Sequence, residues 1–130
     1  MILRKAEKRD IDKIEEIYSD VIAEEEKGLS AIGWIRGVYP TRKTAEDALI
    51  RGDLFVAEEN SAVVGAAIIN KCQVDTYKEA NWRYEATDDK IMVLHTLVIS
   101  PKTSGRGYGK KFVDFYESYA LSNGCPYLRI

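Results

Sequence analysis

Apolar side chains recur along the chain with two different periods, and these periods predict its secondary structure. Spacings of three and four residues predict helices after residues 10 and 107, and a shorter helix is predicted between residues 41 and 52. Runs rich in β-branched residues predict strands at 1–6, 54–59, 62–70, 91–99 and 127–130. This order of strands and helices predicts an α/β or α+β fold with a mixed sheet. We expect residues 1–130 to form a single domain.

Polar residues and glycines mark the ends and irregularities of these elements. Asp10 is the expected N-cap of the first helix, and Thr41 or Thr44 can cap the second. Residues 60–61, an Asn-Ser pair, predict a short turn between two strands. Gly65, inside the second of these strands, predicts a β-bulge or close packing of another group.

The stretch 91–119 combines a strand, a glycine loop and a helix. Pro101 has no N–H to donate, so the strand is expected to end before it. Glycines at 105, 107 and 109 let the backbone approach a ligand, and the first turn of the following helix directs unpaired N–H groups to the same place. The nearby cations are Lys102, Arg106, Lys110 and Lys111. The sequence therefore predicts a phosphate or pyrophosphate site, with a tight turn beside solvated lysines as the alternative.

Two common nucleotide motifs do not fit this loop. A Walker-type loop needs glycine where Ser104 stands and Ser or Thr where Lys111 stands. The dinucleotide fingerprint G-x-G-x-x-G fails because its third glycine falls on Lys110. Both spacings argue against a nucleotide-binding protein.

The segment LVISPKTSGRGYGKKFV instead resembles motif A of the GCN5-related N-acetyltransferases. That motif runs Arg/Gln-x-x-Gly-x-Gly/Ala after a strand and a proline. Gly107 and Gly109 match its small positions, and Ser104 replaces the usual Arg or Gln. The resemblance implies an acyl-CoA N-acyltransferase-like fold that uses acetyl-CoA as the acetyl donor. Relatives continue past residue 130 into a helix and two strands, so we expect a C-terminally incomplete domain.

The resemblance also implies how the donor would bind. The pantetheine arm would lie between parallel strands that splay apart after Ile99 and near Cys125. It would pair with backbone groups of Leu97, Val98 and Ile99, and an N–H there would stabilise the developing oxyanion. The pyrophosphate would be held by Ser104, Gly105, Arg106, Gly107, Tyr108, Gly109 and Lys110.

A general base would help the acceptor amine lose its proton before attack. His95 is the first candidate because it is the chain's single histidine and lies on the predicted central strand. Related enzymes frequently have a glutamate in that part of the strand. In this chain the second candidate is Glu85, which precedes the strand. The alternative for His95 is a hydrogen-bonded core residue.

Aromatic residues in two connecting segments are candidates for substrate binding. Trp34 and Tyr39 lie between the first two helices, where the family resemblance places the acceptor pocket. Tyr77 and Trp82 lie in the polar segment 73–90. The alternatives are that the first pair closes the edge of the core and that the second belongs to a surface hairpin.

Composition narrows the classes of partner. With 19 basic and 21 acidic residues the net charge is −2, which argues against general nucleic-acid binding. No apolar run is long enough to span a bilayer, and the N-terminus lacks the apolar region of a signal peptide. Cys72 and Cys125 lack metal-ligand spacing, so we expect reduced thiols, no metal and a cytoplasmic protein.

The sequence thus predicts an N-acetyltransferase that moves an acetyl group from acetyl-CoA to a primary amine of a small molecule or peptide. The alternative is a non-catalytic acyl-CoA-binding or sensing module. An incomplete sheet would leave an exposed edge, so a homodimer, in which a second chain supplies the missing part, is a further hypothesis.

Overall fold

The structure is a computed structural model that describes residues 1–28, 34–70, 91–103, 105–125 and 127–129. Its helices and strands lie where the spacing of apolar residues predicts them. The strands are β1 (Ile2–Lys5), β2 (Leu54–Glu59), β3 (Ala62–Asn70), β4 (Ile91–Ile99) and β5 (Tyr127–Arg129). The helices are α1 (Ile11–Glu26), α2 (Arg42–Arg51) and α4 (Tyr108–Ser122), with 3₁₀ turns η1 (Lys8–Asp10) and η3 (Pro101–Thr103).

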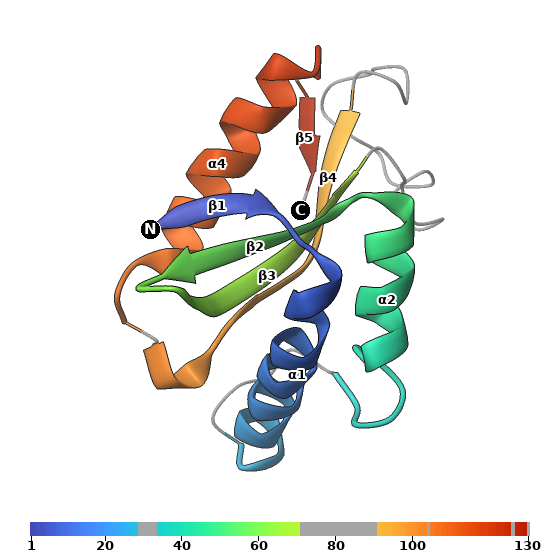
Figure 1. The fold of residues 1–130 in the computed structure, drawn as a ribbon, viewed down its shortest axis with the longest axis vertical. Coiled ribbons are helices and arrows are strands. Elements are labelled where there is room, and N and C mark those ends of the chain that lie inside the picture. The colour runs from blue at the N-terminus through green and yellow to red at the C-terminus, as the bar shows by residue number, and fades with distance from the viewer. Residues whose placement is uncertain (29–33, 71–90, 104, 126, 130) are drawn as a thin grey trace.

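The described strands form one five-stranded sheet whose spatial order follows the sequence, β1-β2-β3-β4-β5. The first four strands pair antiparallel, and β5 is parallel to β4 (Figure 1). The sequence prediction of a mixed α+β sheet is therefore confirmed.

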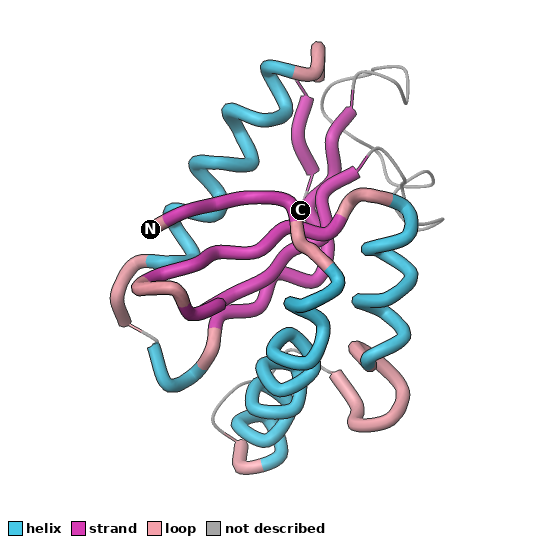
Figure 2. The backbone as a smooth tube through the Cα atoms, in the orientation of Figure 1, coloured by secondary structure: helices cyan, strands magenta, loops and turns pink. Residues whose placement is uncertain are grey.

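Helices cover both faces of the sheet (Figure 2). They do so because successive strand side chains point to opposite faces and are apolar on both. One core cluster joins α1 and α2 to the sheet and is built around Ile14, Ile17, Tyr18, Val56 and Val98. The other joins α4 to the opposite face and contains Phe55, Leu94, Phe112 and Tyr116. In the described part of the chain no helix is both long and apolar enough to cross a membrane.

Short-range sequence signals act at α2 and the β2–β3 turn as predicted. The N–H of Thr41 donates to the Thr44 hydroxyl at 3.0 Å where α2 begins. Asn60 and Ser61 both have positive φ, 51° and 65°, as a tight hairpin turn requires. Gly65 combines both expectations, because a bulge lies beside it and a Cβ there would be 2.8 Å from the Val98 carbonyl oxygen.

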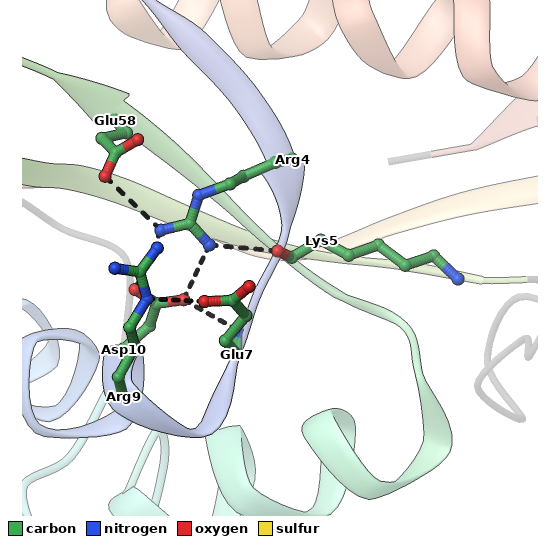
Figure 3. Close-up of polar contacts among 6 residues, drawn as sticks. All are labelled: Arg4, Lys5, Glu7, Arg9, Asp10 and Glu58. Carbon is green, nitrogen blue, oxygen red and sulfur yellow. Dashed lines mark hydrogen bonds and ion pairs between the residues drawn. The ribbon is translucent and has the colours of Figure 1, made fainter. Parts of the chain in front are cut away.

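Asp10 is the N-cap residue of α1, as predicted, but its side chain makes no capping hydrogen bond to that helix. Its carboxylate instead accepts hydrogen bonds from both terminal nitrogens of Arg4, at 2.9 and 3.0 Å, and from the Glu7 N–H at 2.7 Å (Figure 3). Glu58 on β2 lies 3.6 Å from the same guanidinium. Burial alone would raise the pKa of Asp10, but the bonds from Arg4 and Glu7 outweigh it and lower that pKa. Asp10 thus joins the start of α1 to β1.

Candidate functional site

A bulge interrupts β4 in its middle. Ala66 pairs with Val98 and Ile68 with His95, so the intervening residue of β3 faces two residues of β4. Thr96, one of these two, has a φ of 48°, which is unusual for a β-branched residue. Because bulges bend a strand and re-aim its side chains, the two halves of β4 differ in direction.

β4 is paired on its second edge only where it begins. β5 lies beside Ile91–Val93, with Val93 opposite Arg129, and the described residues provide no partner strand beyond that point (Figure 1). The register thus places the paired part of β4 at its start, and the expected separation of the two strands after Ile99 and near Cys125 stays a prediction. Cys125, just before β5, is fully buried.

Backbone groups of the second half of β4 alternate between the two edges. The N–H of Ser100 donates to the Val64 carbonyl of β3 at 2.8 Å. Alternation then directs the backbone groups of Leu97 and Ile99 to the open edge and those of Val98 to β3. Val98 thus departs from the expectation that it pairs with a ligand, since its partner is Ala66 and its side chain lies in the core.

The glycine loop leads directly from β4 into α4. Gly105 and Gly107 have φ values of 81° and 76°, and a Cβ built on either would meet no protein atom within 4 Å. Gly107 is the N-cap of α4, and no side chain of the described residues caps this helix. The first-turn N–H groups of α4 therefore face the loop with the positive end of the helix dipole.

The charged side chains near this loop have different surroundings. Arg106 and Lys110 are exposed. Lys102 lies 3.5 Å from Glu16 and 3.9 Å from Asp20, and these ion pairs join η3 to α1. The ring of Tyr108 is buried against the sheet on the α4 side, so only its backbone could contact a ligand in the loop.

His95 lies on the α1–α2 side of the sheet, immediately before the bulge. Its Nε2 is 3.0 Å from the side-chain oxygen of Asn70, the last residue of β3. The amide nitrogen of Asn70 in turn donates to Asp53 at 2.8 Å. Neither Asp53 nor Asn70 was identified from the sequence, because they approach His95 only through strand pairing.

The segment before α2 brings two predicted aromatic residues to the bulge. The Tyr39 hydroxyl is hydrogen-bonded to the Thr96 hydroxyl, and its ring is 6.1 Å from the ring of Trp34 at 78°. The Trp34 N–H donates to Glu25 of α1 at 3.0 Å, while its side chain packs on the core. Trp34 therefore closes part of the core, and Tyr39 lies beside the open part of β4.

Tyr18 of α1 adds a buried hydroxyl near this site that sequence analysis did not single out. Only 2% of the residue is exposed, and its hydroxyl has no hydrogen-bond partner among the described residues. Burial, with a smaller contribution from the nearby Tyr39, raises the pKa of this hydroxyl. The apolar stripe of α1 predicts that Tyr18 is a core residue. The same stripe does not predict that Tyr18 lies near Tyr39.

A groove of about 500 Å³ lies between α1 and the segment that precedes α2. Its acidic side chains Asp12 and Glu15 are 2.7 and 3.3 Å from Arg42. Glu16 and Asp20 also line the groove, whose two basic lining residues are Arg36 and Arg42, so carboxylates outnumber guanidiniums in its lining.

Four predicted site residues lie outside the described part of the chain, namely Ser104, Tyr77, Trp82 and Glu85. Within the described ranges, no group of three or more His, Cys, Asp or Glu side chains is placed to hold a metal ion.

The chain matches the family model "Acetyltransferase (GNAT) family" over residues 14–130. A mixed sheet with an open parallel pair and a glycine loop before a helix defines the class, and the chain belongs to the GNAT acetyltransferase family.

Solved structures share this fold. A GNAT-family acetyltransferase from Listeria monocytogenes has a TM-score of 0.77 at 23% identity, covering 98% of this chain and 73% of that one. Another, from Streptococcus agalactiae, has a TM-score of 0.78 at 22% identity, covering 91% and 69%. N-acetylglutamate synthase from Neisseria gonorrhoeae, complexed with coenzyme A and N-acetylglutamate, has a TM-score of 0.61 at 17% identity, covering 95% and 23%. No curated protein matches the chain significantly.

Proposed function

We propose that the protein transfers an acetyl group from acetyl-CoA to a primary amine of a small molecule or peptide. The observation that carries this proposal is that β4 is followed, after η3, by two glycines of positive φ and by a helix N-terminus that no side chain of the described residues caps. Membership of the GNAT family and the fold shared with a coenzyme A complex support it.

The residues present fit the donor along its length. Leu97 and Ile99 offer backbone donors and acceptors on the open edge of β4, where the amides of a pantetheine arm can pair like another strand. A Cβ on Gly107, the N-cap of α4, would meet no atom of the described residues within 4 Å, and the first-turn N–H groups of this helix suit a diphosphate. The expected contribution of Ser104 through Lys110 is thus mainly that of the backbone.

His95 is the proposed general base. An amine of pKa ~10.4 needs about 4–5 kcal/mol to become the free base at neutral pH, so a nearby proton acceptor lowers the barrier. As the amine nitrogen bonds to the acetyl carbon, the carbon–sulfur bond breaks. The protonated amine loses two protons on its way to the amide: one passes to His95, and the other reaches the departing thiolate, which leaves as the free thiol. An N–H on the open edge of β4 would donate to the acetyl oxygen, an effect worth roughly 3–4 kcal/mol in other acyl transfers.

Tyr39 is proposed to contact the acceptor. Its hydroxyl is bonded to Thr96 at the bulge, next in sequence to His95, and the residue is 40% exposed. Trp34 supports the Tyr39 ring from behind. Tyr77, Trp82 and Glu85 stay predictions.

The test uses two glycines with the same backbone conformation. Gly107→Ala and Gly52→Ala both place a Cβ in open space at positive φ, 76° and 82°, so each should lose about 1 kcal/mol of stability. Only Gly107→Ala should weaken coenzyme A binding, by tenfold or more in isothermal titration calorimetry, since its methyl group enters the proposed phosphate site. Equal affinities in the two folded variants would contradict the proposed site.

Turnover is measured separately, as thiol release from acetyl-CoA with a panel of amines. Release that depends on an amine would support the transferase. Coenzyme A binding without release would favour the acyl-CoA-binding module.

A further inference from the structure

Asp53 is held in place from several directions between α2 and β2. Its carboxylate accepts from Arg51, at 2.9 Å from Nε and 3.3 Å from Nη2. Its N–H donates to the Ala48 carbonyl at 3.1 Å, and its own carbonyl accepts from Ile69 at 3.0 Å. Only 8% of the residue is exposed. The carboxylate is therefore a fixed acceptor at the end of β3.

This fixed carboxylate determines which way the Asn70 amide points. A carboxylate paired with a guanidinium only accepts hydrogen bonds, so the Asn70 nitrogen, 2.8 Å away, must face Asp53. The Asn70 oxygen then faces His95, with 3.0 Å between it and Nε2. Since an amide oxygen has no hydrogen to donate, the bond forms only if His95 carries a hydrogen on Nε2.

We infer that Asp53 and Asn70 are positioning residues that hold His95 in the tautomer with hydrogen on Nε2, so that Nδ1 is the nitrogen that takes up a proton. That Nδ1 takes this proton from an acceptor amine rests on the proposed function. The tautomer itself does not, because it follows from the bonds between the three side chains.

The same arrangement supports the charged form of the ring. When Nδ1 takes a proton, the positive ring donates a stronger, charge-assisted hydrogen bond from Nε2 to the Asn70 oxygen. The Asp53 carboxylate polarises the amide between them in the favourable direction. Arg51 pairs with the Asp53 carboxylate at 2.9 Å and balances its charge.

Nitrogen-15 NMR tests the tautomer directly, because the chain has a single histidine and its ring nitrogens give no overlapping signals. In the wild-type protein above the pKa of His95, the hydrogen should reside on Nε2. Asn70→Ala and Asp53→Ala should each shift part of the population to the Nδ1–H form. Asp53→Asn should restore the wild-type spectrum, since an amide oxygen in the place of Oδ2 still accepts from Arg51 and Asn70.

An Nδ1–H tautomer in the wild-type protein would overturn the inference, and so would an unchanged tautomer population in Asn70→Ala. The wild-type spectrum decides the first point even if a variant fails to fold.

Acetyl transfer provides the second readout. The kcat of Asn70→Ala and Asp53→Ala should fall about tenfold or more, with little change in the KM for acetyl-CoA. Asp53→Asn should lose less kcat than Asp53→Ala, and Asp47→Asn, a control on α2 whose exposed carboxylate pairs with Lys43, should stay near wild type. A wild-type protein without acetyl transfer would defeat the proposed function while the spectra still decided the tautomer. Equal kcat losses in Asp53→Asn and Asp53→Ala would count against positioning through the carboxylate oxygen.

Discussion

At the scale of single residues, two buried tyrosines differ in a way that can be measured. The hydroxyl of Tyr18 is buried and has no hydrogen-bond partner in the described part of the chain, which should reduce stability by roughly 1–3 kcal/mol. Tyr18→Phe removes the hydroxyl and keeps the ring, so the free energy of unfolding in urea should rise by about 1 kcal/mol.

Tyr116 provides the matched control on α4. It is equally buried, but its hydroxyl donates to the Met92 carbonyl of β4. Tyr116→Phe should lower the free energy of unfolding by about 1 kcal/mol or more, because a buried carbonyl loses a donor. Losses of similar size in both variants would show that Tyr18 has a partner.

Asp10 should make the free energy of unfolding depend on pH in the acidic range. Its pKa is lowered in the folded protein, so its contribution is complete above the ordinary carboxyl pKa of ~4 and disappears as the pH falls through the folded value. Asp10→Asn should remove about 2 kcal/mol at neutral pH and much less in acid, measured by denaturation at a series of pH values.

Asp12→Asn is the comparison for this prediction, since its carboxyl is 88% exposed although it also pairs with an arginine. It should change stability little at any pH. A constant difference between wild type and Asp10→Asn from neutral pH to acid would show that the Asp10–Arg4 bonds do not depend on ionisation.

At the scale of elements, β3 and β4 approach each other so closely that one position must lack a side chain. A Cβ on Gly65 would lie 2.7 Å from Ile99 Cδ1 and 2.8 Å from the Val98 carbonyl oxygen, and the backbone oxygen cannot rotate away. Gly65→Ala should therefore lower the free energy of unfolding by about 1–3 kcal/mol and displace the open half of β4.

Gly109 is the matched control because it contacts the same side chain without a clash. A Cβ there would lie 4.0 Å from Ile99 Cγ1, at ordinary contact distance. Gly109→Ala should leave stability unchanged or raise it by up to about 1 kcal/mol, since alanine favours a helix. Equal stability of the two variants would mean that β4 moves freely away from β3.

Local signals explain why most elements could be predicted from the sequence. The turn at residues 60–61 and the strand–glycine–helix unit each depend on neighbours in the chain, and both occur where expected. The bulge at Thr96 could not be predicted, because a β-branched residue gives no sign of a positive φ. The role of Asp10 was missed for a related reason, since its partner Arg4 belongs to another element.

The candidate site was predictable only where one segment builds it. The glycine loop and His95 were found from residues 91–110, whereas Asp53 and Asn70 meet His95 through the pairing of β2, β3 and β4. The register of β4 and β5 could not be predicted either, because the sequence of neither strand specifies it.

At the scale of the whole molecule, the shift in Tm on adding a ligand should distinguish coenzyme A compounds from other nucleotides. A ligand that binds only the folded state at 100 times its Kd stabilises the protein by about 2.7 kcal/mol, which corresponds to a shift of several degrees in Tm. Coenzyme A and acetyl-CoA should give this shift, while ATP and NAD at the same concentration should not. Equal shifts with all four compounds would indicate general anion binding.

β4 is the central feature of this molecule because half of one edge is unpaired in the described structure. Such an edge can accept any extended chain, including the same segment of another copy. A bound coenzyme would occupy those amides and carbonyls, so it would also shield the sheet from self-association. The protein should therefore keep better in storage with coenzyme A than alone, and this protection should disappear in Gly107→Ala.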